Sequence, residues 1–385
     1  MLFTSNIKHQ KKKILHSQSI QCKFISNISA LLMTTKTRDD LKNLLDSFNE
    51  AIKYWLTNLD NTTKSTGNSK ITDPIDELYK LIKLIKAHVT KVGIIFKPNN
   101  LKKDPNVAYN TLEKLSETLV LLISLIQLFK IKQEEISKIF YDEIFNNVKN
   151  LIVSINQLSN ELMIIFDQDG DNDEDDREEV SDDGRLVGVG RIWSNCDALI
   201  KLLDEGAVGL LSNKIKQSIL LLDDGFEEFK EWAENPQDMD DDPFGFSDDD
   251  EADDEEEGEE DDRYVNEEPP VDNSEISKFA LKWVKKIELI KLLISSFKKS
   301  IPKTTSGQLI DEINSIQLKL INLIDKFIMN LMLDTTIDEE ILKNTKEITL
   351  QANKLSKIGI SIHSTDDKKS KWYETWINKF IIDSE

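Results

Sequence analysis

Apolar residues recur at alternating steps of three and four along most of this chain, and this spacing constrains the fold more than any other feature. Such runs extend over residues 75–96, 112–129, 148–165, 283–297 and 309–327. Because an α-helix has about 3.6 residues per turn, each run stays on one helix face. A strand would need alternation by two, and no sustained case occurs. The sequence therefore predicts an all-α protein.

Helix start signals agree with this pattern. Asp73-Pro74 and Asp104-Pro105 each place a capping carboxylate before a proline that suits the first helical turn. Thr305 with Gln308 and Thr336 with Glu339 have capping-box spacing. The segment 119–125 is apolar on nearly all faces, which places its helix at the centre of a bundle. We expect ten helices, near residues 39–59, 74–96, 105–130, 133–166, 187–204, 208–233, 275–299, 306–333, 337–359 and 369–382.

The net charge of −22 is concentrated in two acidic tracts. Residues 167–183 carry a net charge of −10 and residues 237–268 one of −18. One-signed segments with few apolar residues cannot bury a core, so we expect the longer tract to be a disordered linker. The predicted organisation is a basic, disordered extension (1–38), an N-terminal helical bundle with an acidic loop at 167–183 (39–234), the acidic linker (235–273) and a C-terminal helical bundle (274–383).

Residues 1–32 contain no acid and are rich in Lys and Ser. This composition could be that of a mitochondrial targeting segment, but we favour a disordered extension or a start codon placed too early, because such matches are unspecific. No stretch of the chain has the roughly 18 unbroken apolar residues of a membrane span. We therefore expect no membrane binding.

The chain carries no recognisable catalytic or cofactor motif, so we expect neither enzymatic activity nor a cofactor. Acids at 167, 169, 171, 173, 175 and 178 have EF-hand ligand spacing, but Asn172 stands where the sharp turn needs Gly. We interpret this tract as a solvated loop, with no metal site predicted. Cys196 would need a histidine partner to act as a nucleophile, and His88 is the only histidine of the first bundle. Both lie on apolar faces, which favours a core thiol.

Three linker residues are candidates for regulation. Phe244 and Phe246 are aromatic residues inside the acidic run, so they either anchor in a partner's groove or fold back on the bundle. Ser247 precedes four acids, which suits an acid-directed kinase, although an unmodified serine is an equal alternative. Trp372, Tyr373 and Trp376 have helical spacing, and we expect them to pack in a core.

Several segments, taken in order, resemble one family. They are HVTKVGIIFKPNN (88–100), RIWSNCDALIKL (191–202), LLLDDGFEEFKEWAE (220–234), DPFGFSDDD (242–250), KFALKWVKKIELIKLLISSF (278–297) and KWYETWINKF (371–380). Their order, with an acidic insert between helical lobes, resembles the Grap-and-cyclin-D-interacting protein family (GCIP, cyclin-D-binding protein) over roughly residues 40–382. The linker here is more acidic than the family pattern, and the N-terminal extension departs from it.

The resemblance implies an all-α protein of cytoplasm and nucleus that binds D-type cyclins and helix-loop-helix transcription factors and restrains the cell cycle. It implies protein partners, with no direct nucleic-acid binding. No binding residue can be carried over, because the family has no sharp motif. Two other readings remain. Long amphipathic helices also suit a talin- or vinculin-like cytoskeletal adaptor, and the acidic tracts suit a chaperone for basic proteins such as histones.

Overall fold

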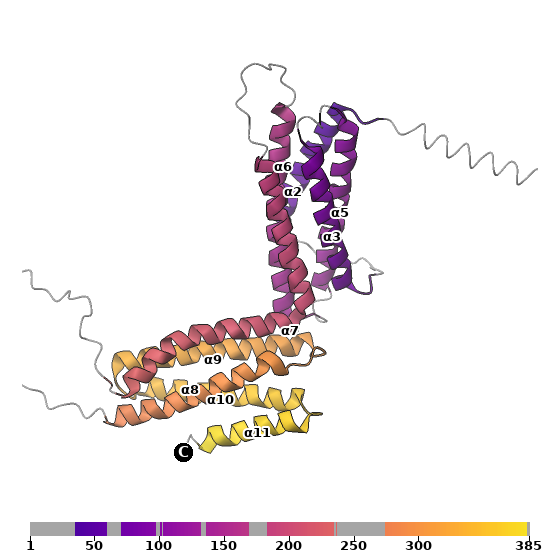
Figure 1. The fold of residues 1–385 in the computed structure, drawn as a ribbon. Coiled ribbons are helices and arrows are strands. Elements are labelled where there is room, and N and C mark those ends of the chain that lie inside the picture. Colours follow the sequence, from indigo (N-terminus) through magenta and orange to yellow (C-terminus); the bar gives the residue numbers. More distant parts are fainter. Residues whose placement is uncertain are drawn as a thin grey trace, which may run out of the picture. The chain divides into compact units, whose positions relative to one another are not determined.

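The computed structural model describes residues 35–59, 71–97, 101, 103–131, 136–168, 183–234, 236 and 274–382. In this part of the chain the regular elements are helices, which confirms the all-α prediction (Figure 1). They are α2 (Arg38–Asn58), α3 (Pro74–Ile95), α5 (Pro105–Ile131), α6 (Lys138–Gln168), α7 (Asp183–Glu234), α8 (Ser274–Ser300), α9 (Gly307–Asp334), α10 (Glu339–Ile362) and α11 (Asp367–Ile382). Among these residues no helix combines the length and the apolar character that crossing a membrane requires.

The two helices expected at 187–204 and 208–233 are the two halves of α7. They are separated by Gly206, whose φ of 65° and ψ of −175° lie outside the helical region. This backbone conformation is accessible almost only to glycine, because a Cβ atom would clash with the neighbouring backbone. The glycine therefore sets the break between the halves.

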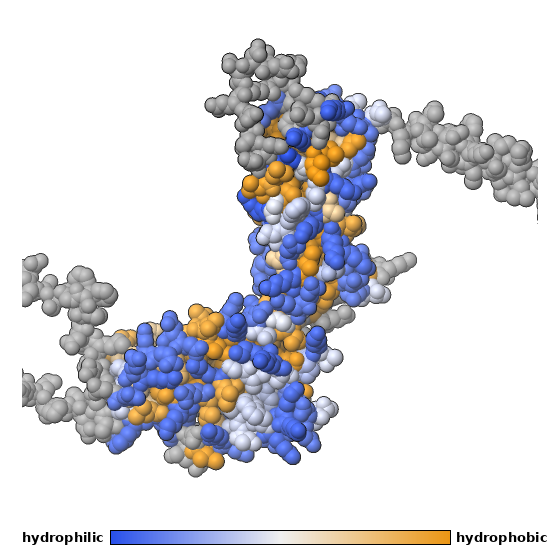
Figure 2. Space-filling model, viewed as in Figure 1, coloured by the Kyte–Doolittle hydropathy of each residue, from blue (hydrophilic) through white to orange (hydrophobic). Residues whose placement is uncertain are grey.

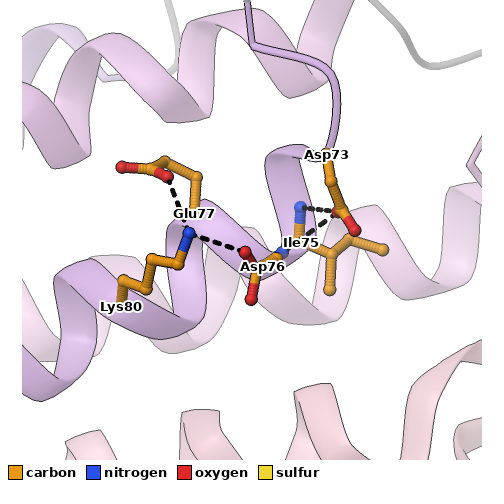
Figure 3. A network of polar contacts seen from close by, with 5 residues as sticks. All are labelled: Asp73, Ile75, Asp76, Glu77 and Lys80. Atoms are coloured by element: carbon orange, nitrogen blue, oxygen red, sulfur yellow. Dashed lines mark hydrogen bonds and ion pairs between the residues drawn. The ribbon is translucent and has the colours of Figure 1, made fainter.

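The start of α3 shows how the sequence specifies a helix end (Figure 3). The Asp73 carboxylate accepts hydrogen bonds from the backbone N–H groups of Ile75 (3.0 Å) and Asp76 (3.1 Å). Pro74 occupies the first turn, where its missing N–H costs nothing. Lys80 then pairs with Asp76 at 2.7 Å, one turn further on. Asp104 caps α5 in the same way, through the N–H of Val107, so both predicted caps are confirmed.

The two predicted capping boxes are wrong. At α10 the capping residue is Asp338, whose carboxylate accepts from the Ile341 N–H at 2.7 Å. At α9 it is Ser306, which makes no side-chain capping bond. The Thr305 hydroxyl instead donates to the Pro302 carbonyl within the preceding turn. In both places a closer polar residue displaced the threonine that spacing alone had selected.

The chain forms two compact units. Unit 1 comprises the described residues of 1–128 and 145–200, and unit 2 those of 129–144 and 201–385. Helices α5, α6 and α7 therefore each contribute residues to both units. This division differs from the expected bundles at 39–234 and 274–383, because the second half of α7 packs with the C-terminal helices.

The core of unit 1 is mainly aliphatic. Helices α2, α3, α5, α6 and the first half of α7 each contribute one buried stripe, as the periodicity predicts. The stripe of α5 is narrower than expected, because Val120 and Leu121 are 49% and 58% exposed. That helix is not enclosed on all sides. The fully buried stripe residues include Leu41, Leu78, Ile82, Ile85, Val89, Leu112, Leu115, Leu122, Val148, Leu151, Ile192 and Leu199.

The core of unit 2 is rich in aromatic side chains. The ring of Phe327 in α9 lies 5.0 Å from Trp283 in α8 and 5.9 Å from Phe229 in α7. Tyr373 and Trp376 of α11 are buried, as expected, whereas Trp372 is 37% exposed. Residues on both sides of the acidic tract meet in one core, which explains why that tract does not mark the boundary between the units.

A long-range cap also stabilises unit 2. The Asp311 carboxylate of α9 accepts hydrogen bonds from the Ser137 hydroxyl (2.8 Å) and from the backbone N–H groups of Lys138 (2.7 Å) and Ile139 (3.0 Å). Those groups form the N-terminus of α6, where unpaired N–H groups and the helix dipole favour an anion. A Cβ atom at Gly307 would lie 2.4 Å from the Ser137 nitrogen, so only glycine permits this approach.

Candidate protein-interaction surface

Helices α3 and α7 pack against each other in unit 1, and three contacts fix their register. A Cβ atom added at Gly93 would lie 2.8 Å from Val189. The Trp193 indole N–H donates to the Thr90 hydroxyl at 3.2 Å. Lys86 forms an ion pair with Asp197 at 2.5 Å. As the residue numbers fall along α3 they rise along α7, so the two helices run antiparallel.

Large apolar side chains are exposed along this pair of helices. Trp193 is 39% exposed, and Ile94, one turn of α3 beyond Thr90, is 60% exposed. Leu186 lies two helical turns before Trp193 on the same face of α7 and is 52% exposed. Gly190 lies between them, with open space where a side chain would stand. Figure 2 shows hydrophobic residues exposed among hydrophilic ones on the visible face of this unit. We define the α3/α7 surface as Lys86, Thr90, Ile94, Leu186, Gly190, Trp193 and Asp197.

The contacts around Trp193 hold the indole ring in place. Its only N–H is satisfied by Thr90, and the Lys86 ammonium lies 5.8 Å from the ring centroid. A large ring with few rotatable bonds and a satisfied polar group loses little entropy when it is covered by a partner. For this reason tryptophan is enriched at the energetic centres of protein interfaces.

Helix α3, which forms one side of this surface, is basic along most of its length. Residues 78–97 contain five lysines and no acid. Lys80 is paired with Asp76 and Lys86 with Asp197, whereas Lys91 has no acidic partner among the described residues. The α3/α7 surface therefore combines exposed hydrophobic side chains with one neutralised ion pair, on a helix that is otherwise basic.

Cys196 and His88, the two residues considered for nucleophilic chemistry, have different surroundings. Cys196 is fully buried, and burial raises the pKa of its thiol to about 12. The His88 Nδ1 atom is 3.1 Å from the Thr118 hydroxyl. Burial, with Lys91 and Lys114 nearby, lowers the His88 pKa. The expectation that Cys196 is a core thiol is confirmed. In the described residues, no three acidic, histidine or cysteine side chains converge on a metal position.

The linker candidates Phe244, Phe246 and Ser247 lie outside the described residues, as do the acids at 169–178. Trp193 was not predicted as a site residue, although it lies in a segment that carries the family resemblance. The sequence does contain a pattern that indicates the exposure of Trp193. Ile192 and Cys196 continue the buried stripe of α7, so the intervening tryptophan falls beside that stripe and toward solvent.

The described part of the chain is thus all-helical, with large apolar side chains exposed along α3 and α7 and a buried thiol at Cys196. Residues 77–235 match the family model described as Grap2 and cyclin-D-interacting, N-terminal. The match confirms the family resemblance for this segment, which contains the whole α3/α7 surface.

Two fungal proteins are similar over most of the chain. An uncharacterized protein of Saccharomyces cerevisiae is 29% identical over 369 residues, covering 89% of this chain and 97% of its own length. An uncharacterized protein of Schizosaccharomyces pombe is 22% identical over 329 residues, covering 82% of this chain and 86% of its own. The similarity therefore continues beyond the matched domain into the C-terminal helices.

Proposed function

We propose that this protein is a non-enzymatic regulator that acts by binding other proteins through the α3/α7 surface. The observation that carries the proposal is the exposed, held indole of Trp193 inside the family domain. The finer proposal follows the family description. The partner is a cyclin or a helix-loop-helix factor, and the protein restrains the cell cycle and transcription from the cytoplasm and nucleus.

The chemistry of the surface favours a protein partner over nucleic acid. A nucleic-acid site needs a continuous basic track. Here the surface carries an acid, Asp197, one helical turn from Trp193, and Lys86 is already paired with it. The apolar groups Ile94 and Leu186 suit the buried centre of a protein interface, and the exposed lysines suit its rim.

Affinity capture from cell extract, followed by mass spectrometry, tests this proposal. The baits are the full chain, a deletion of residues 235–272, Trp193→Ala, and Trp372→Ala as a matched control. Trp372 has almost the same exposure as Trp193 but lies in α11 of unit 2. We expect a cyclin or helix-loop-helix factor with the full chain, the deletion and the control, and its loss with Trp193→Ala.

Other outcomes would replace the proposal. Histones that are captured by the full chain and lost with the deletion, with no cyclin recovered, would favour the acidic chaperone. Co-sedimentation of the purified chain with actin filaments would favour the cytoskeletal adaptor. Equal capture by both tryptophan variants would move the interface away from the α3/α7 surface.

A further inference from the structure

Unit 2 contains a groove between α9 and α10, with a volume of about 1100 Å³. Lys319, Leu323 and Lys326 line it from α9. Lys343, Asn344, Lys346 and Leu350 line it from α10, together with Glu339, Glu340 and Glu347. All of these residues lie beyond the family match at 77–235. The groove is therefore separate from the α3/α7 surface in both sequence and family assignment.

A ladder of ion pairs spans the two helices and fixes their register. The pairs are Glu312–Lys354 (2.9 Å), Lys319–Glu347 (2.5 Å) and Lys326–Glu340 (2.7 Å). Each step advances seven residues along α9 and returns seven along α10, which is the heptad spacing of antiparallel helices packed along their length. Three ion pairs therefore link α9 to α10, and two of them join residues that line the groove.

The ladder leaves two groove lysines free for a ligand. Lys319 and Lys326 are neutralised by Glu347 and Glu340. Lys343 and Lys346 have no acidic partner in the described part of the chain, and both are exposed. With Leu350, which is 59% exposed, they lie at steps of three and four on one face of α10. That face presents two cations beside an apolar side chain.

Asn344 adds a polar group at the groove. This side chain is only 8% exposed, and its amide nitrogen donates to the Leu323 carbonyl at 3.1 Å. Its oxygen has no donor among the described residues. The hydrogen bond to the Leu323 carbonyl joins α10 to α9 beside the groove and helps to hold the two helices in one register.

We propose that this groove binds an acidic amphipathic helix of a second partner protein. Carboxylates of that helix pair with Lys343 and Lys346, and its apolar side chains cover Leu323 and Leu350. Glu339, Glu340 and Glu347 line the same groove, so a uniformly anionic polymer such as nucleic acid is disfavoured. An amphipathic helix can turn its apolar and charged sides to match.

The test is a fluorescence anisotropy titration of the full-length chain with a labelled synthetic helix that repeats Leu and Glu in heptads. We expect saturable binding that weakens with added salt. Lys343→Glu with Lys346→Glu should weaken it at least about tenfold, because two attractions become repulsions. The matched control is Lys278→Glu with Lys285→Glu, the same charge change on the exposed face of α8, and it should stay within about twofold.

A charge swap makes the result independent of folding defects. A probe with Lys in place of Glu should bind the Lys343→Glu, Lys346→Glu variant better than the unaltered chain. Equal weakening by both double variants, or none by either, would overturn the proposal. Binding seen only after residues 237–268 are deleted would also overturn it, because the chain's own acidic tract would then be the occupant. Trp193→Ala should leave binding of the helix probe unchanged. The proposal for the groove can therefore be tested independently of the proposal for the α3/α7 surface.

Discussion

The two units use aromatic side chains differently. In unit 2 the rings of Phe229, Trp283 and Phe327 meet in the core, where burial of large rings supplies stability. In unit 1 the core is mainly aliphatic, and Trp193 lies on the surface with its N–H bound to Thr90. Aromatic side chains therefore build the core of unit 2, whereas in unit 1 one of them lies at the centre of the proposed binding surface.

The largest effect that tests this contrast is on stability. Phe327→Ala removes a fully buried ring that contacts three others, and we expect a loss of about 3–5 kcal/mol in the free energy of unfolding of unit 2. Trp193→Ala should cost about 1 kcal/mol or less. Urea unfolding of both variants gives the comparison. Similar losses would contradict the division between a structural and a binding role.

A smaller effect is expected at the break in α7. Gly206→Ala places a Cβ atom on a backbone that only glycine adopts comfortably, which should cost about 1–3 kcal/mol. Gly225→Ala is the matched control, because Gly225 lies within a helical stretch of the same α7 and has open space at its Cβ position. It should stabilise by about 0.5–1 kcal/mol. Thermal unfolding in which both variants change in the same direction would disprove the strained break.

The long-range cap of unit 2 should contribute less again. Asp311→Ala removes the acceptor for three donors at the start of α6, and we expect a loss of about 0.5–2 kcal/mol. Glu312→Ala, which breaks only the exposed pair with Lys354, should cost about 1 kcal/mol or less. Amide hydrogen exchange at residues 138–140 should become faster in Asp311→Ala and not in Glu312→Ala. Unchanged exchange in Asp311→Ala would show that this cap does not stabilise the start of α6.

The smallest effect is on pH dependence. Burial lowers the pKa of His363 below its ordinary value of 6.5, with Lys369 also lowering it and Asp366 opposing. The folded chain therefore resists protonation of this ring, which stacks on Tyr373. The stability that depends on neutral His363 is present above about pH 6.5 and falls as the pH drops below it. Urea unfolding from pH 7.5 to 5.5 should show a shallower decline in His363→Gln. Identical slopes would show that this ring does not contribute.

Much of the fold follows from local sequence. The helix positions agree with the periodicity, and Asp73 and Asp104 cap as predicted, because these features depend on neighbours within one or two turns. The division into units was not predictable in this way. An apolar stripe such as Leu211 to Phe229 predicts that one helix face is buried, but it does not predict which other helix packs against that face. The acidic tract after residue 234 therefore suggested a boundary that the cores do not have.

The candidate sites were harder to predict than the helices. The partner of Ser137 is 174 residues away, and the groove of unit 2 exists only because α9 and α10 pair in one register. The exposure of Trp193 could be predicted only once it was known which side of α7 faces the core. The linker aromatics Phe244 and Phe246 are easily recognised in the sequence because acidic residues surround them. A tryptophan beside a hydrophobic stripe resembles one more core residue.

The most direct measurement is the dissociation constant of the purified full-length chain for a purified D-type cyclin, determined by calorimetry for the unaltered chain, Trp193→Ala and Trp372→Ala. We predict that Trp193→Ala weakens binding by at least about tenfold, as loss of an interface anchor does, whereas Trp372→Ala changes it by less than about twofold. Equal affinities for all three chains, or a larger loss with Trp372→Ala, would contradict the assignment of the α3/α7 surface as the site of protein binding.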